Sequence, residues 1–90
     1  MTSIRIPSPL QSYVGGNREV SVQGNSVGEV VQKLTERYPG LAIHLFTEDG
    51  SLRPYVHLYR NDTNVSDLDG MKTVIEKNDR LMIVPSIAGG

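Results

Sequence analysis

The 90-residue chain contains no cysteine, an absence that excludes disulfides, thiolate metal sites and a thiol nucleophile. If the protein handles sulfur, it cannot hold it as a cysteine persulfide, so a carboxyl group or an amine is the remaining covalent handle. The chain also lacks an apolar run near the roughly 18 residues of a membrane span, and its start lacks a signal-peptide pattern. These absences predict a cytoplasmic protein with no membrane partner.

Positive and negative side chains are nearly equal in number, and the chain has a formal net charge of −1. This balance gives no electrostatic reason to expect nucleic acid as a partner. One stretch, 61–71, contains Asp62, Asp67 and Asp69 but neither Lys nor Arg. We interpret it as a solvated face, with the steering of a basic partner as the alternative.

Residue patterns typical of catalysis are missing as well. His44 and His57 are far apart in sequence and lack a His-x-x-x-His spacing, so we expect no metal site. No glycine-rich nucleotide-binding motif occurs, and Ser26 is expected to cap a helix rather than act as a nucleophile. The sequence therefore predicts a protein that is not an enzyme, has no catalytic residues and binds no cofactor itself.

Alternating apolar residues predict two strands near the start of the chain, around 4–6 and 20–22. They are expected to pair as an antiparallel hairpin. The intervening segment 7–16 is rich in proline and glycine and is predicted to be a loop. Leu10 and Tyr13 are expected to hold this loop against the core.

A helix is predicted to begin after Ser26, because Ser26 and Glu29 have the spacing of a capping box. Its apolar face is formed by Val27, Val30, Val31, Leu34 and Tyr38. Glu29 and Lys33 are spaced for a favourable ion pair along the helix. Pro39-Gly40 is predicted to end the helix, and 41–46 to form an irregular turn.

The second half of the chain contains two further strand patterns. Residues 55–59 alternate between apolar and polar side chains, whereas 81–84 are apolar on both faces, which is typical of a central strand. Pro85 is expected to mark the end of that strand, since it cannot donate a ladder hydrogen bond. Between these strands lies a loosely structured stretch with four predicted core anchors, Val65, Leu68, Met71 and Val74.

This order of elements predicts an α+β fold with a mixed sheet of four to five strands packed on one main helix. A hairpin, a crossing helix and a late central strand indicate a ubiquitin-like β-grasp, with the first and last strands adjacent and parallel. We expect a single domain over 1–85 and a flexible C-terminal tail over 86–90.

The tail carries the most informative chemistry. Gly89-Gly90 place a carboxylate without a neighbouring side chain at the end of the chain. Such a thin end can enter a narrow active site on another protein, with Ala88 and Gly89 giving slim access. An ionised carboxylate can attack a nucleotide phosphate, and a sulfur donor can displace the resulting acyl-adenylate.

Several segments resemble the small ubiquitin-like sulfur carriers (MoaD/ThiS-like). This family includes the molybdopterin synthase small subunit, the thiamine-pathway carrier and the cysteine-biosynthesis carrier, to which the chain looks most similar. The ending 84–90 is the specific part of the resemblance. The supporting segments are Ile4–Pro7 with Leu10, Gly15-Gly16, Ser26–Gly40, Tyr55–Asp62 and Asn78–Arg80.

The resemblance implies that Gly90 is adenylated by a ubiquitin-activating-type enzyme that uses ATP, and becomes a thiocarboxylate that carries sulfur covalently. The recipient would be a biosynthetic enzyme, with a pyridoxal-phosphate cysteine synthase favoured, then molybdopterin assembly, then thiamine thiazole formation. The residues expected to contact partners are Tyr59, Met82, Val84, Pro85 and Ile87. For Met82 and Val84, ordinary core packing is the alternative.

Two other functions remain open at this point. One is a ubiquitin-like modifier joined to target lysines through Gly90, and the other is a non-covalent β-grasp binding module that does not use the tail. Two positions depart from the family pattern: Arg60 stands where an aliphatic residue is usual, and His57 replaces an asparagine. Either the third strand has ended at Arg60, or Arg60 pairs with an acid such as Asp62.

Overall fold

The computed structural model describes residues 1–85, and residues 86–90 lie outside the described part of the chain. Five strands form one sheet in the order β2-β1-β5-β3-β4. Their bounds are β1 Thr2–Arg5, β2 Glu19–Val22, β3 Val56–Arg60, β4 Thr63–Asn64 and β5 Arg80–Pro85. The parallel pairing of β1 with β5 and the antiparallel pairing of β1 with β2 confirm the prediction, and β3 pairs antiparallel with both β4 and β5.

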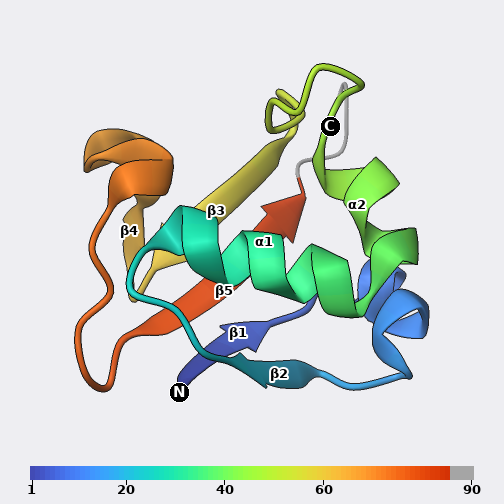
Figure 1. Cartoon of the computed structure of the whole chain (residues 1–90), viewed down its shortest axis with the longest axis horizontal. Helices are drawn as coiled ribbons and strands as arrows, with labels where there is room; N and C mark the ends of the chain where they lie inside the picture. Colours follow the sequence, from blue (N-terminus) through green and yellow to red (C-terminus); the bar gives the residue numbers. More distant parts are fainter. Residues whose placement is uncertain (86–90) are drawn as a thin grey trace.

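The long helix α1, Val27–Arg37, crosses one face of this sheet (Figure 1). The backbone N–H of Glu29 donates to the Ser26 hydroxyl at 3.2 Å, which confirms Ser26 as the helix cap. Lys33 and Glu29 form the expected ion pair at 3.6 Å. No helix within residues 1–85 has the length and apolarity to cross a membrane.

The core lies between α1 and the inner face of the sheet. Ile4 of β1, Leu58 of β3 and Leu81 and Ile83 of β5 are all buried against the helix side chains. From α1, the buried residues are Val27, Val30, Val31 and Leu34. This two-layer β-grasp confirms the predicted α+β architecture, with β5 at the centre of the sheet.

The predicted loop 7–16 is mostly a 3-10 helix, η1, Ser8–Val14, so that prediction is wrong in part. Leu10 is buried as expected, but the second anchor is Val14 rather than Tyr13. Tyr13 remains 40% exposed and stacks on His44, with 4.3 Å between the ring centroids. The helical turn places Leu10 and Val14 on the same side, which a loop prediction could not specify.

A second helix, α2, spans Pro39–Leu45, where the sequence predicts a stop and an irregular turn. Proline does end α1, yet it also suits the first turn of a new helix, because its missing N–H has no partner there. Leu41 and Leu45 lie one turn apart and are both fully buried. The apolar run 41–46 is thus a short core-packing helix.

The segment between β4 and β5 is more ordered than predicted. It contains two 3-10 turns, η2 Val65–Asp67 and η3 Gly70–Lys72. Val65 is buried and Met71 packs against the core, but Leu68 and Val74 are 41% and 61% exposed. The prediction of Leu68 and Val74 as core anchors is therefore wrong, because apolar character alone does not determine which residues of an irregular stretch face the core.

Candidate functional site

The face of the sheet opposite α1 presents a strip of half-buried side chains along β5. Leu81 and Ile83 point into the core, so alternation places Met82 and Val84 on the outer face. Tyr59 lies directly opposite Met82 in the β3–β5 register, and His57 lies opposite Val84. Three predicted partner-binding residues, Tyr59, Met82 and Val84, are thus brought together, although their role in binding stays a prediction.

Pro85 is the last described residue and still pairs with Val56 in the register of the sheet. The N–H of Asn61 donates a hydrogen bond to the carbonyl of Arg80, so the backbone N–H and C=O of Arg80 face β3. Because these groups alternate in direction along a strand, those of Met82 and Val84 face β3 as well. Position 85 instead faces β1, whose pairing with β5 ends at Met82. A proline there removes no ladder hydrogen bond, and β5 keeps its place in the sheet up to the start of 86–90.

The predicted reactive end lies outside the described residues. This applies to Gly90, the expected site of adenylation and thiocarboxylate formation. It applies equally to the access residues Ala88 and Gly89, to the partner-contact residue Ile87 and to the predicted flexibility of 86–90. Their roles remain predictions.

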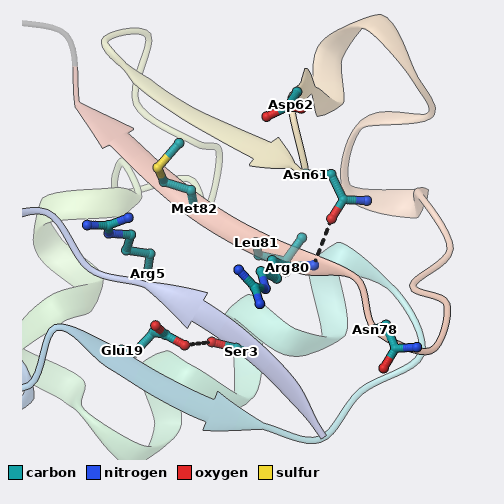
Figure 2. Close-up of a pocket in the computed structure, with 9 residues that line it drawn as sticks. All are labelled: Ser3, Arg5, Glu19, Asn61, Asp62, Asn78, Arg80, Leu81 and Met82. Carbon is teal, nitrogen blue, oxygen red and sulfur yellow. Dashed lines mark hydrogen bonds between the residues drawn. The ribbon is translucent and has the colours of Figure 1, made fainter.

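Two shallow hollows lie on the outer face, one on each side of Met82, and together they form what we call the β5 groove. Figure 2 shows the first, in which Arg5, Arg80 and Met82 lie over β1 and β5. The second follows the final part of β5 and is lined by Arg18, Val84 and Pro85, with Arg5 and Met82 shared between the two. Neither Arg5 nor Arg18 is among the predicted partner-binding residues, although the alternation of Arg5 with Ile4 and Ile6 indicates that Arg5 lies on the outer face.

The histidines behave as surface and packing residues. His57 is half-buried, and its Nδ1 lies 3.5 Å from Nδ2 of Asn64 on β4. Within residues 1–85, no group of three or more His, Asp or Glu side chains is placed to hold a metal ion.

Arg60 extends β3 to its last position and forms an ion pair with Asp79, with 2.9 Å between Nε and Oδ2. Asp62, the partner suggested by the sequence, is not involved. Asp79 also accepts hydrogen bonds from the N–H of Glu76 at 2.8 Å and from Nδ2 of Asn61 at 3.0 Å. These contacts, led by the Glu76 N–H, lower the pKa of Asp79 below the usual aspartate value.

Replacing this carboxylate is expected to destabilise the domain in a pH-dependent way. The depressed pKa means that ionised Asp79 stabilises the fold above pH ~4, and that this contribution is lost as the pH falls through the folded-state value. Asp79→Asn should therefore lower the free energy of unfolding at pH 7 by about 1–3 kcal/mol and have a much smaller effect at pH 2–3. Urea unfolding at both pH values measures this.

The matched control is Asp62→Asn, which removes an exposed carboxylate close to the same turn. It is expected to change stability by less than about 0.5 kcal/mol at either pH. Equal destabilisation by Asp79→Asn at pH 7 and at pH 2–3 would contradict the proposed role of the ionised carboxylate.

Comparison with known proteins resolves the family. The ThiS family profile matches residues 4–90, which is nearly the whole chain. The chain belongs to the ThiS family. Its β-grasp fold, the expected sulfur-carrier resemblance and its small size all agree with this membership.

Relatives of this ThiS-family chain include the sulfur carrier protein CysO of Mycobacterium bovis. It is 33% identical over 90 residues, which cover 98% of this chain and 97% of the relative. Small archaeal modifier protein 3 of Haloferax volcanii is 40% identical over 65 residues, covering 72% of this chain and 70% of that protein. The chain is thus a sulfur carrier protein of the CysO/ThiS type, and the CysO homologues are small carriers rather than enzymes.

Solved structures give the same result for the fold. A chain of the Amycolatopsis orientalis BexX/CysO complex superimposes with a TM-score of 0.89 at 29% identity, covering 100% of both chains. CysO of Mycobacterium tuberculosis superimposes with a TM-score of 0.87 at 30% identity, covering 97% of this chain and 100% of that one.

Proposed function

We propose that this protein works in the cytoplasm as a sulfur carrier whose Gly90 carboxylate is converted to a thiocarboxylate and then donates sulfide. The observation that carries the proposal is the ThiS-family match through residue 90, which includes both terminal glycines. The absence of cysteine supports the proposal, because the chain has no thiol on which to carry sulfur. The carboxyl group of Gly90 is a remaining group to which sulfur can be attached covalently.

The chemistry proceeds in two displacements on a partner enzyme of the ubiquitin-activating type. The C-terminal carboxylate, with a reference pKa of about 3.5, is ionised at neutral pH and attacks the α-phosphorus of ATP, releasing pyrophosphate. The sulfur of a sulfide donor then attacks the acyl carbon of the adenylate and releases AMP. The carrier contributes the carboxylate and the docking surface, whereas the partner contributes the catalytic groups.

The recipient that we favour is a pyridoxal-phosphate enzyme of cysteine biosynthesis, followed by molybdopterin assembly and then by thiamine thiazole formation. Support comes from the CysO relatives, which align over nearly the full length of both chains. The A. orientalis CysO structure, solved in a complex with BexX, supports a partner enzyme that docks on the folded carrier.

Intact-mass analysis tests this function. The full chain is incubated with ATP, its activating enzyme and a sulfide source, and a reaction without ATP serves as the control. We expect a mass gain equal to the difference between sulfur and oxygen, mapped by fragmentation to Gly90. An unchanged mass under conditions in which the activating enzyme hydrolyses ATP would overturn the proposal.

Docking through the outer face makes a separate prediction. Met82→Glu places a charge in the centre of the strip formed with Tyr59 and Val84, and should reduce kcat/KM for thiocarboxylate formation by roughly tenfold or more. The matched control is Ile43→Glu, at a side chain that is 66% exposed on α2. Equal loss of activity in the two variants, at unchanged melting temperatures, would argue against this docking surface.

A second function is favoured by one specific observation, the 40% identity to small archaeal modifier protein 3. We propose as the alternative that Gly90 is joined to lysine side chains of target proteins. Adenylation activates the carboxylate for attack either by a sulfur donor or by a lysine amine. Tryptic digests of cell extracts should then contain lysines bearing Gly-Gly remnants that disappear when the gene is deleted. Digests without such remnants would remove this alternative.

A further inference from the structure

The β5 groove on the outer face is lined by three arginines. Arg5 lies at its centre beside Met82, Arg80 lies in the first hollow, and Arg18 lies in the second hollow beside Pro85 (Figure 2 shows Arg5, Arg80 and Met82). All three side chains are solvent-exposed, so their guanidinium groups are available to a docking molecule.

None of these guanidinium groups is neutralised by an ion pair within the described residues. The two ion pairs found there join Lys33 to Glu29 and Arg60 to Asp79, and none of these four residues lines the groove. Glu19 lies opposite Arg5 in the β1–β2 register, but its carboxylate accepts a hydrogen bond from the Ser3 hydroxyl (Figure 2). Glu19 and Asp62 also line the first hollow, whereas the second hollow is lined by Arg5 and Arg18 and by no acidic residue. The positive charge of the groove is thus concentrated in the second hollow, in a chain whose net charge is −1.

The floor of the groove beside the start of 86–90 is apolar. Met82, Val84 and Pro85 of β5 lie there half-buried, and Arg5 of β1 and Arg18, just before β2, line the same hollow from the neighbouring side of the sheet. A segment that fills this hollow must therefore combine apolar contact with negative charge. Arginine binds carboxylates through paired N–H donors, which gives such a contact a defined geometry.

We propose that the β5 groove binds a carboxylate-rich segment of the enzyme that docks on this carrier. The inference rests on the proposed function and adds to it the chemical character of the partner. The acidic segment contacts Arg5 and Arg18, which both lie on the β1–β2 side of β5, in the hollow that Pro85, the last described residue, also lines. Charge complementarity of this kind accelerates encounter and fixes register more than it raises affinity.

The experiment uses the full ¹⁵N-labelled chain titrated with hexaglutamate at low salt, with hexalysine as the control peptide. Hexaglutamate should shift the amide signals of Arg5, Met82 and Val84, and added salt should weaken binding because exposed charges are screened. Arg5→Gln/Arg18→Gln should weaken binding roughly fivefold to tenfold. The charge-matched control, Lys72→Gln/Lys77→Gln, should leave it within about twofold of wild type.

The same two double variants are then assayed with the activating enzyme. The arginine variant should raise KM for the carrier about tenfold at low salt with kcat unchanged, and the lysine variant should leave both parameters unchanged. Signals that shift equally around all basic residues, or equal losses in the two variants, would overturn the groove assignment.

Different experimental results would overturn the groove assignment and the proposed sulfur-carrier function. Normal kinetics of thiocarboxylate formation in Arg5→Gln/Arg18→Gln would overturn the groove assignment and leave the sulfur-carrier function standing. Specific hexaglutamate binding in a chain that never acquires sulfur would support the groove and overturn the carrier function.

Discussion

Deletion of Gly90 is expected to abolish thiocarboxylate formation while shifting the melting temperature by no more than about 2–4 °C. We expect a small stability effect because, within residues 1–85, a continuous core already includes buried apolar residues from Ile4 to Ile83. Activity is lost because the shortened chain ends about 3.3–3.6 Å earlier, and nucleophilic attack requires the reacting atoms to meet within about 3–3.5 Å. Intact mass and calorimetry measure the two effects.

Gly90→Ala is the matched control for this deletion. It keeps the length of the tail and adds one methyl group beside the carboxylate, so we expect slower sulfur incorporation without complete loss. Wild-type function in the chain lacking Gly90 would contradict the carrier mechanism. That result would favour a non-covalent binding module that acts through its sheet face alone.

Replacement of Ile83 by alanine should produce the largest loss of stability. Ile83 is 1% exposed at the centre of β5, the middle strand of the sheet, and packs against the inner layer of helix side chains. Removing its buried methyl groups leaves a cavity and should cost about 2–5 kcal/mol. For a domain of this size the melting temperature should fall by roughly 10–30 °C. Urea and thermal unfolding followed by circular dichroism measure the change.

Its neighbour Val84 provides the control on the opposite face. Val84 is half-buried on the outer surface, so Val84→Ala should cost less than about 1 kcal/mol of unfolding free energy. The same substitution should weaken partner docking if the outer strip acts as proposed. Equal destabilisation by the two variants would contradict the assignment of one inner and one outer face to β5.

The strands and the main helix could be predicted from sequence because each carries its own local signal. Alternation set the faces of β1, β2 and β3, and Ser26 with Glu29 marked the start of α1. The continuous apolar run before Pro85 identified the central strand. From these elements the β-grasp topology followed.

The errors fall where proline or a short turn makes local signals ambiguous. Pro39 is predicted to end the first helix, but proline is also compatible with the first turn of a new helix such as α2. Leu68 and Val74 follow the single turns η2 and η3 and are exposed, because apolar character alone does not show which residues of an irregular stretch face the core.

The site was predictable only in part. Alternation was sufficient to place Tyr59, Met82 and Val84 on one face once β3 and β5 were known to pair. The position of Arg60 on the third strand indicates that it needs an acidic partner. The sequence could not identify that partner as Asp79, because the two residues of this ion pair are distant in sequence. The clustering of Arg5 with Arg18 depends on the path of the chain through η1.

The place of β5 in the sheet also affects how the protein is made. β5, which joins the β1–β2 hairpin to β3 and β4, is synthesised after those four strands. A nascent chain that stops before residue 80 lacks this connection and has no continuous sheet to bury its apolar residues. Such a fragment would be open to proteases and could not occupy partner enzymes as a folded competitor. Completion of the five-stranded sheet thus comes just before synthesis of 86–90, the segment that carries the proposed reactive residue, Gly90.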